Sequence, residues 1–204
     1  MGEDRSVMTT LQDKGSEALQ ELMNEAEMIA TAMIRETGEM RAAIFIHGQE
    51  GKTIFRPKSM ATEAAKDEYA ADARIVCMAE GADAVVYCSE AWMLSPKTGR
   101  SVDLTMPPSK SPDRQEVLVL MGESREGYLH KSLPICRSES GKFAGFGEAT
   151  ELWPDRVEGR FGQLLSEEKP SADERELAKL ILHSRGLTTY KKKRREQGHG
   201  RGIF

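Results

Sequence analysis

The chain has 204 residues, of which 39% are hydrophobic and 30% are charged, and its formal net charge is −4 at pH 7. These values lie near the averages of globular domains and exclude collagen-like, rod-like and wholly disordered chains. No apolar run approaches the roughly 20 residues that cross a bilayer, and the first residues lack the apolar block of a secretory signal. We therefore expect one globular domain, alone or with an appendage, that is cytoplasmic and has no membrane partner.

An amphipathic helix is predicted over residues 16–37, where apolar side chains recur at steps of three and four. Ser16 can cap its start, and Gly38 can take the left-handed conformation that ends a helix. Two short apolar runs follow at 42–47 and 52–56, and a glycine-containing turn separates them. Their spacing predicts a β-hairpin.

A second helix is predicted over residues 60–80, after Pro57 stops the hairpin. Ser59 can cap its start and Gly81 can end it. One face of this helix carries the small and apolar side chains that we expect to pack on the core. They are Ala61, Ala64, Ala65, Tyr69, Ala73, Val76 and Cys77.

Apolar runs at 84–93, 116–122 and 128–136 predict three further strands, and 142–149 predicts a weaker fourth. Short turns between consecutive strands imply antiparallel pairing, and each amphipathic helix must bury one apolar stripe. The sequence therefore predicts an α+β fold. We expect a mainly antiparallel sheet of five to six strands with two helices packed on one face, and then a C-terminal helix and a basic tail.

The C-terminal helix is indicated by Ser171 and Glu174, which have the spacing of a capping box. Leu177, Leu180 and Ile181 form its expected apolar face, which needs a covering surface. The expected organisation is a flexible N-terminus (1–15), an α+β core domain (16–152), a linker with a helix (153–186) and a disordered basic tail (187–204).

A pair of carboxylates supports an enzymatic hypothesis. The connection over 94–115 is rich in proline and serine, and its length is typical of a lid or binding loop. If the flanking strands pair, Glu90 and Glu116 can approach each other, and two close carboxylates shift each other's pKa values as acid–base chemistry requires. The alternative is that Arg114 neutralises one carboxylate and the other faces water. The residues of this hypothetical hydrolytic site are Glu90, Asp113, Arg114, Glu116 and His130.

We expect neither a metal nor a cofactor. The four histidines are scattered, and no Cys-x-x-Cys or His-Glu-x-x-His spacing occurs. Cys77 and Cys88 fall on predicted buried surfaces and are therefore interpreted as small apolar residues. Three cysteines without close pairing suit a reducing compartment. The glycines of residues 141–147 belong to a predicted hairpin and not to a strand-to-helix phosphate loop.

The last 22 residues carry seven Lys or Arg and one acidic residue, so an acidic body ends in a basic tail. A solvated chain end is one interpretation of such a block. The other is weak, non-specific contact with nucleic acid, whose affinity would fall as salt rises. The residues that would make this contact are Lys191, Lys192, Lys193, Arg194 and Arg195.

The stretch AEGADAVVYCSEAW at 79–92, followed by Pro107-Pro108-Ser109 and by Asp113-Arg114-Gln115-Glu116, resembles a pattern in bacterial hypothetical proteins with no assigned function. This resemblance spans about residues 40–150 and implies no catalytic residues. Separately, the order of elements is similar to that of the small roadblock-type domains. That similarity implies a role in dimerisation or partner binding.

Three functions follow from these observations. The leading hypothesis is a non-catalytic binding domain that associates with itself, as a homodimer, or with a protein partner, and that carries the third helix and the tail as an arm. The second is a hydrolase with its carboxylates at the loop 94–115. The third is a nucleic-acid accessory protein that acts through the basic tail.

Overall fold

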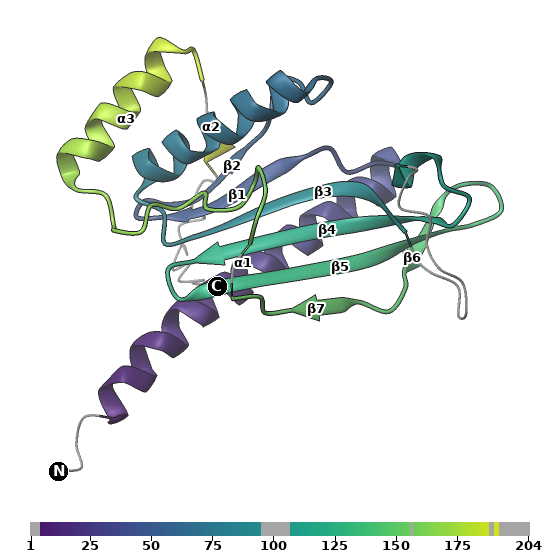
Figure 1. The fold of residues 1–204 in the computed structure, drawn as a ribbon, viewed down its shortest axis with the longest axis horizontal. Helices are drawn as coiled ribbons and strands as arrows, with labels where there is room; N and C mark the ends of the chain where they lie inside the picture. Colours follow the sequence, from purple (N-terminus) through teal and green to yellow (C-terminus); the bar gives the residue numbers. More distant parts are fainter. Residues whose placement is uncertain (1–4, 95–106, 156, 188–189, 192–204) are drawn as a thin grey trace, which may run out of the picture.

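A computed structural model describes residues 5–94, 107–155, 157–187 and 190–191. Its elements in chain order are α1 (Arg5–Thr37), β1 (Ala43–Gly48), β2 (Gly51–Phe55), α2 (Glu63–Glu80), β3 (Ala84–Leu94), the 3-10 helix η1 (Pro108–Lys110), β4 (Arg114–Ser124), β5 (Gly127–Arg137), β6 (Phe143–Phe146), β7 (Thr150–Leu152), α3 (Ala172–Ser184) and β8 (Tyr190–Lys191). The strand order is β6-β5-β4-β3-β1-β2-β8, with β7 beside β5, and every pairing is antiparallel (Figure 1). The predicted α+β class is confirmed.

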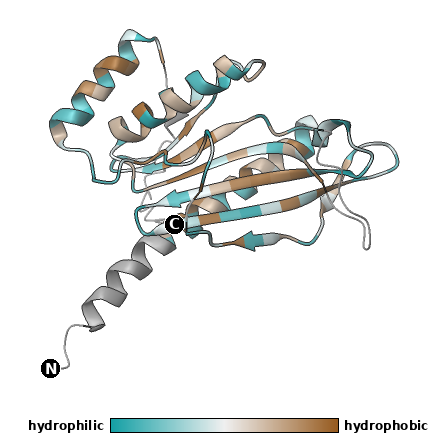
Figure 2. Cartoon of the chain, in the orientation of Figure 1, coloured by the Kyte–Doolittle hydropathy of each residue, from teal (hydrophilic) through white to brown (hydrophobic). Residues whose placement is uncertain are grey.

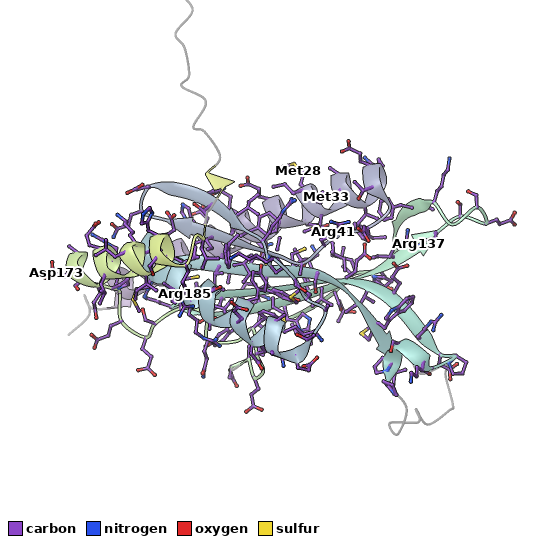
Figure 3. All side chains as sticks on the ribbon, turned by 90° about the horizontal axis from the view of Figure 1, so that it is seen from above. Met28, Met33, Arg41, Arg137, Asp173 and Arg185 are labelled. Carbon is purple, nitrogen blue, oxygen red and sulfur yellow. The ribbon has the colours of Figure 1, made fainter. Side chains whose placement is uncertain are left out.

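The sheet lies between α1 and α2. Along the central strands, Phe45 and Val86 pack in one core cluster with α1, whereas their neighbours Ile44 and Val85 pack in a second cluster with α2. Figure 3 shows the two helices on opposite sides of the strands. The expectation that both helices share one face is therefore corrected. The physical reason is that β1 and β3 are apolar on both faces, as fully covered strands usually are.

Helix α1 begins at Arg5, so Ser16 lies inside it and does not cap it. Its buried side chains recur at steps of three and four, as predicted, and the helix ends where the backbone of Gly38 turns left-handed with φ 86° and donates to the Ile34 carbonyl at 2.9 Å. The helix crosses the sheet closely at Gly122, where an added Cβ would lie 2.9 Å from the side chain of Leu19. The fully buried side chains of the stripe are Leu19, Leu22, Met23, Ala26, Ala30 and Ile34.

Helix α2 starts three residues later than predicted, because Thr62 and not Ser59 provides the cap by accepting from the Ala65 amide. Gly81 ends it in the left-handed conformation, as predicted, with φ 57°. Ala61 precedes the helix and Ala64 lies in its first turn, and both are exposed. The other predicted core residues, Tyr69, Ala73, Val76 and Cys77, are buried, and Ala65 is partly so.

Helix α3 packs on α2 with a different face from the predicted one. The capping box of Ser171 and Glu174 is present. However, Ala178 and Leu182 make the buried contact, whereas Leu177 and Leu180 remain 59% and 67% exposed. Figure 2 shows hydrophobic (brown) and hydrophilic (teal) stretches following one another along this helix. The predicted apolar face of α3 is wrong because a small residue, Ala178, can pack closely on a neighbouring helix while larger side chains point outward.

Candidate functional site

A cleft of about 750 Å³ lies beside β3, past the start of β1 and the end of β2. This volume is typical of sites for small molecules. One wall is formed by the chain before β1 and by β3, the second by the connection from β2 to α2, and the third by a loop that follows β7. The lining residues are Met40, Arg41, Ala42, Arg56, Pro57, Lys58, Ser59, Met60, Lys66, Tyr87, Ser89, Glu90, Ala91, Arg160 and Phe161.

The third wall, the loop 157–166, is bound to α2 through one guanidinium group. Arg74 donates to the carbonyl oxygens of Arg160 at 3.1 Å, Gly162 at 3.0 Å and Gln163 at 3.1 Å. A guanidinium has five donors in a rigid, planar fork, so one side chain can hold several carbonyls at fixed positions. Gln163 has φ 53°, the only left-handed non-glycine residue among those described, which shows how tightly the loop turns around Arg74.

A buried carboxylate holds the other end of the same loop. Glu123 on β4 is only 7% exposed and accepts hydrogen bonds from the backbone amides of Leu164 at 2.8 Å and Leu165 at 3.1 Å. Burial raises the pKa of Glu123, and these two amide donors oppose that rise. Leu164 is itself buried in the α2 cluster. The loop is therefore anchored to both the sheet and the helix.

Aromatic rings form the apolar part of the cleft. Phe161 stacks on Tyr87 of β3, with ring centroids 4.1 Å apart and planes 7° apart, and it meets Tyr69 of α2 edge-on at 5.7 Å. The Tyr69 hydroxyl donates to the carbonyl of Phe55 at 2.9 Å. Burial raises the pKa of Tyr87, so its hydroxyl stays neutral at physiological pH. The rings give the cleft a rigid, uncharged surface.

Glu90 and Glu116 lie on the same face of the sheet, on the side of α1. In the β3–β4 register Glu90 is opposite Leu118 and Trp92 is opposite Glu116, so the two carboxylates are diagonal neighbours. Glu116 receives two bonds from Arg137, at 2.7 and 2.5 Å. Figure 3 labels Arg137 and Arg41 at the same end of the sheet. Arg137, and not the expected Arg114, neutralises this carboxylate.

Glu90 is the less compensated of the two carboxylates. Its Oε1 accepts from the Met40 amide at 2.6 Å, and burial raises the pKa of its carboxyl, with a smaller contribution from the charge of Glu116. Glu90 also lines the cleft, whereas Glu116 does not. One carboxylate with a raised pKa therefore lines the cleft, without a second cleft-lining carboxylate among the described residues.

The other residues of the hypothetical hydrolytic site lie elsewhere. The guanidinium of Arg114 lies 4.7 Å from the Trp92 ring and donates to the Ser109 carbonyl, and the backbone of Asp113 bonds to the Ser111 hydroxyl. His130 points to the face opposite Glu90 and Glu116, because it alternates on β5 with core residues of the α1 side. Its Nε2 is buried without a hydrogen-bond partner among the described residues, and burial lowers its pKa. Residues 95–106 of the proline-rich loop lie outside the described residues.

Two of the three thiols are buried, and burial disfavours the thiolate form that acts as a nucleophile. Burial raises the pKa of Cys88 to about 12 and raises that of Cys77 as well, which favours their interpretation as small apolar residues. Within the described part of the chain, no group of three or more His, Cys, Asp or Glu is placed to hold a metal ion. Of the predicted nucleic-acid contacts, only the backbone of Lys191 is described, and Lys192, Lys193, Arg194 and Arg195 lie outside the described residues.

Comparison of the chain with protein-family models, with curated proteins and with solved structures finds no match. The two resemblances noted in the sequence therefore gain no support from a family. Among the helices that are described, none has the length and apolar character needed to cross a bilayer. The function has to be argued from the cleft itself.

The pH dependence of stability provides a test of the Glu90 environment. A raised native pKa means that Glu90 stabilises the fold below the ordinary pKa of glutamate, near 4.5, and that this contribution is lost as pH rises through the native pKa. We therefore expect the free energy of unfolding of the wild type, minus that of Glu90→Gln, to fall as the pH rises above about 4.5 and to level off above the native pKa. Urea unfolding across this range measures it. A difference that stays constant or rises with pH would show that Glu90 is not desolvated.

Proposed function

We propose that this protein works by binding a small molecule in the cleft. The observation that carries the proposal is that the cleft is built in advance: its third wall is held by Arg74, Glu123 and the stack of Phe161 on Tyr87. A rigid wall needs no ordering when a ligand arrives, so little conformational entropy is lost on binding.

The proposal extends to the compartment. All three cysteines, Cys77, Cys88 and Cys136, are free thiols, and Cys136 is exposed. Exposed thiols persist in reducing surroundings, which supports an assignment to the cytoplasm. The homodimer and the protein partner expected from the sequence stay predictions, and so does the nucleic-acid contact of the tail.

A fragment screen tests the cleft as the binding site. We expect soluble aromatic fragments to shift the backbone NMR signals of residues 40–42, 56–60, 87–91 and 160–161 together. Ala91→Trp places a large side chain on the cleft wall and should abolish these shifts. The matched control is Ala144→Trp on β6, an exposed position outside the cleft, which should leave them intact. Hits that map elsewhere, or that survive Ala91→Trp, would exclude the cleft.

Hydrolysis in the same cleft is the second candidate, and the raised pKa of the cleft-lining Glu90 favours it. A panel of nitrophenyl esters, glycosides and phosphates tests it. If Glu90 exchanges protons with a substrate, one class of substrate should be turned over by the wild type and not by Glu90→Gln. Equal background rates for the two proteins on every class would rule this candidate out.

A further inference from the structure

The charges that line the cleft are unequal. Five of the described residues that line the cleft have cationic side chains. Among the same described lining residues, only Glu90 has a carboxylate. Glu90 accepts from the Met40 amide, and among the described residues no salt bridge joins it to any of these cations. The cations are Arg41, Arg56, Lys58, Lys66 and Arg160.

Three of these cations have carboxylate partners outside the cleft. Arg41 pairs with Glu39 at 2.8 Å, Lys66 pairs with Glu63 at 2.6 Å, and Arg160 contacts Glu63 at 2.7 Å as well as Asp67. The Glu63 side chain is 71% exposed, and that of Glu39 is 53% exposed. Exposed pairs contribute little free energy, so a bound anion can recruit these cations at small cost.

Arg56 and Lys58 have no carboxylate partner among the described residues. Both are exposed, on either side of Pro57, and the Arg56 guanidinium contacts the sulfur of Met33 on α1 at 3.3 Å. Pro57 fixes its own φ and so limits the freedom of the segment that carries the two cations. Two uncompensated positive charges at one mouth of a small-molecule cleft attract an anion.

We infer that the ligand is a small molecule with a phosphate group and an apolar, planar body, and this inference rests on the proposed function. Arg56 and Lys58 bind the phosphate group, and the planar body lies toward Phe161. A guanidinium matches two phosphate oxygens at once, and a lysine adds a third donor. The Ser59 hydroxyl oxygen accepts from the Ala61 amide, so its own hydrogen remains able to donate to the ligand. The opposite wall offers the ring of Phe161, which lies against Tyr87.

Three probes with the same aromatic body separate charge from shape: 1-naphthyl phosphate, 1-naphthalenemethanol and 1-naphthylmethylamine. We expect the phosphate to shift the NMR signals of residues 56–60 and 160–161, with an affinity that falls as salt rises, and the amine not to bind. If the alcohol or the amine binds the cleft as tightly as the phosphate, the inference about the ligand is wrong while the cleft remains a binding site. If no probe binds although the fragment screen yields cleft hits, the inference is also wrong. If that screen yields no cleft hits either, the proposed function fails too.

A charge-matched pair of variants assigns the contact. The double variant Arg56→Gln/Lys58→Gln should weaken 1-naphthyl phosphate binding by about tenfold or more, the usual effect of losing charge-assisted hydrogen bonds. The control Arg35→Gln/Lys142→Gln removes the same charge from exposed positions outside the cleft and should change the affinity less than about twofold. Equal weakening by the two double variants would reduce the effect to net charge and overturn the assignment.

Discussion

Gly48→Ala is expected to lower the free energy of unfolding by about 3 kcal/mol, because no space exists for its methyl group. Gly48 ends β1 directly beneath the end of α2. An added Cβ would lie 2.5 Å from the carbonyl oxygen of Glu80 and 2.9 Å from the Cβ of the same residue. That oxygen also accepts from the Gln49 amide at 3.0 Å. The nearest clash is with backbone, so the end of α2 has to move and this hydrogen bond is strained.

Gly127→Ala is the matched control for this experiment. Gly127 opens β5, has no atom within 4 Å of its hypothetical Cβ, and does not have a left-handed φ. We expect its stability to change by less than about 0.5 kcal/mol. Urea unfolding followed by circular dichroism compares the two variants. If Gly48→Ala proves as mild as Gly127→Ala, α2 does not rest on the β1–β2 turn as described.

Glu123→Ala is expected to destabilise the fold by about 2 kcal/mol and to release the third wall of the cleft. The substitution leaves the amides of Leu164 and Leu165 without an acceptor, and an unsatisfied buried donor costs about 1 to 3 kcal/mol. The cost of burying the carboxylate, visible in its raised pKa, offsets part of this loss. Ligand binding in the cleft should also weaken, because the third wall carries Phe161.

Glu126→Ala, three residues along the same hairpin, removes an exposed carboxylate and serves as the control for Glu123→Ala. We expect the amides of Leu164 and Leu165 to exchange with deuterium much faster in Glu123→Ala and at the wild-type rate in Glu126→Ala. Unchanged exchange at both amides in Glu123→Ala would mean that the carboxylate does not hold the loop.

Most of the fold was predictable because its signals are local. Glycine positions set the ends of the first two helices, and apolar runs placed the long strands to within two residues. The arrangement of the helices was not predicted, although a cue exists in the sequence. The runs 43–48 and 84–88 are apolar at nearly every position, which favours strands that are covered on both faces. The exposure of Leu177 and Leu180 depends on how closely α3 approaches α2, which periodicity does not determine.

The cleft could not be predicted because its walls are far apart in the sequence. Only the cations on either side of Pro57 give a local signal, as a charged turn between a strand and a helix. Arg160 and Phe161 fall in a polar stretch that is typical of a linker, and nothing in the sequence shows that Arg74, 86 residues before Arg160, binds the Arg160 carbonyl. Within the predicted carboxylate site, the approach of Glu90 and Glu116 follows from the pairing of β3 with β4. The side of the sheet that His130 faces depends on its register in β5.

A crystal structure of the protein soaked with a pool of aromatic fragments tests most directly whether the cleft is the binding site. We predict electron density for a fragment between residues 56–60 and Phe161, with the loop 157–166 unchanged relative to the free protein. Fragments bound only elsewhere while the cleft stays empty and accessible in the lattice, or a loop 157–166 that leaves Arg74 and Glu123, would contradict a binding function built on this cleft.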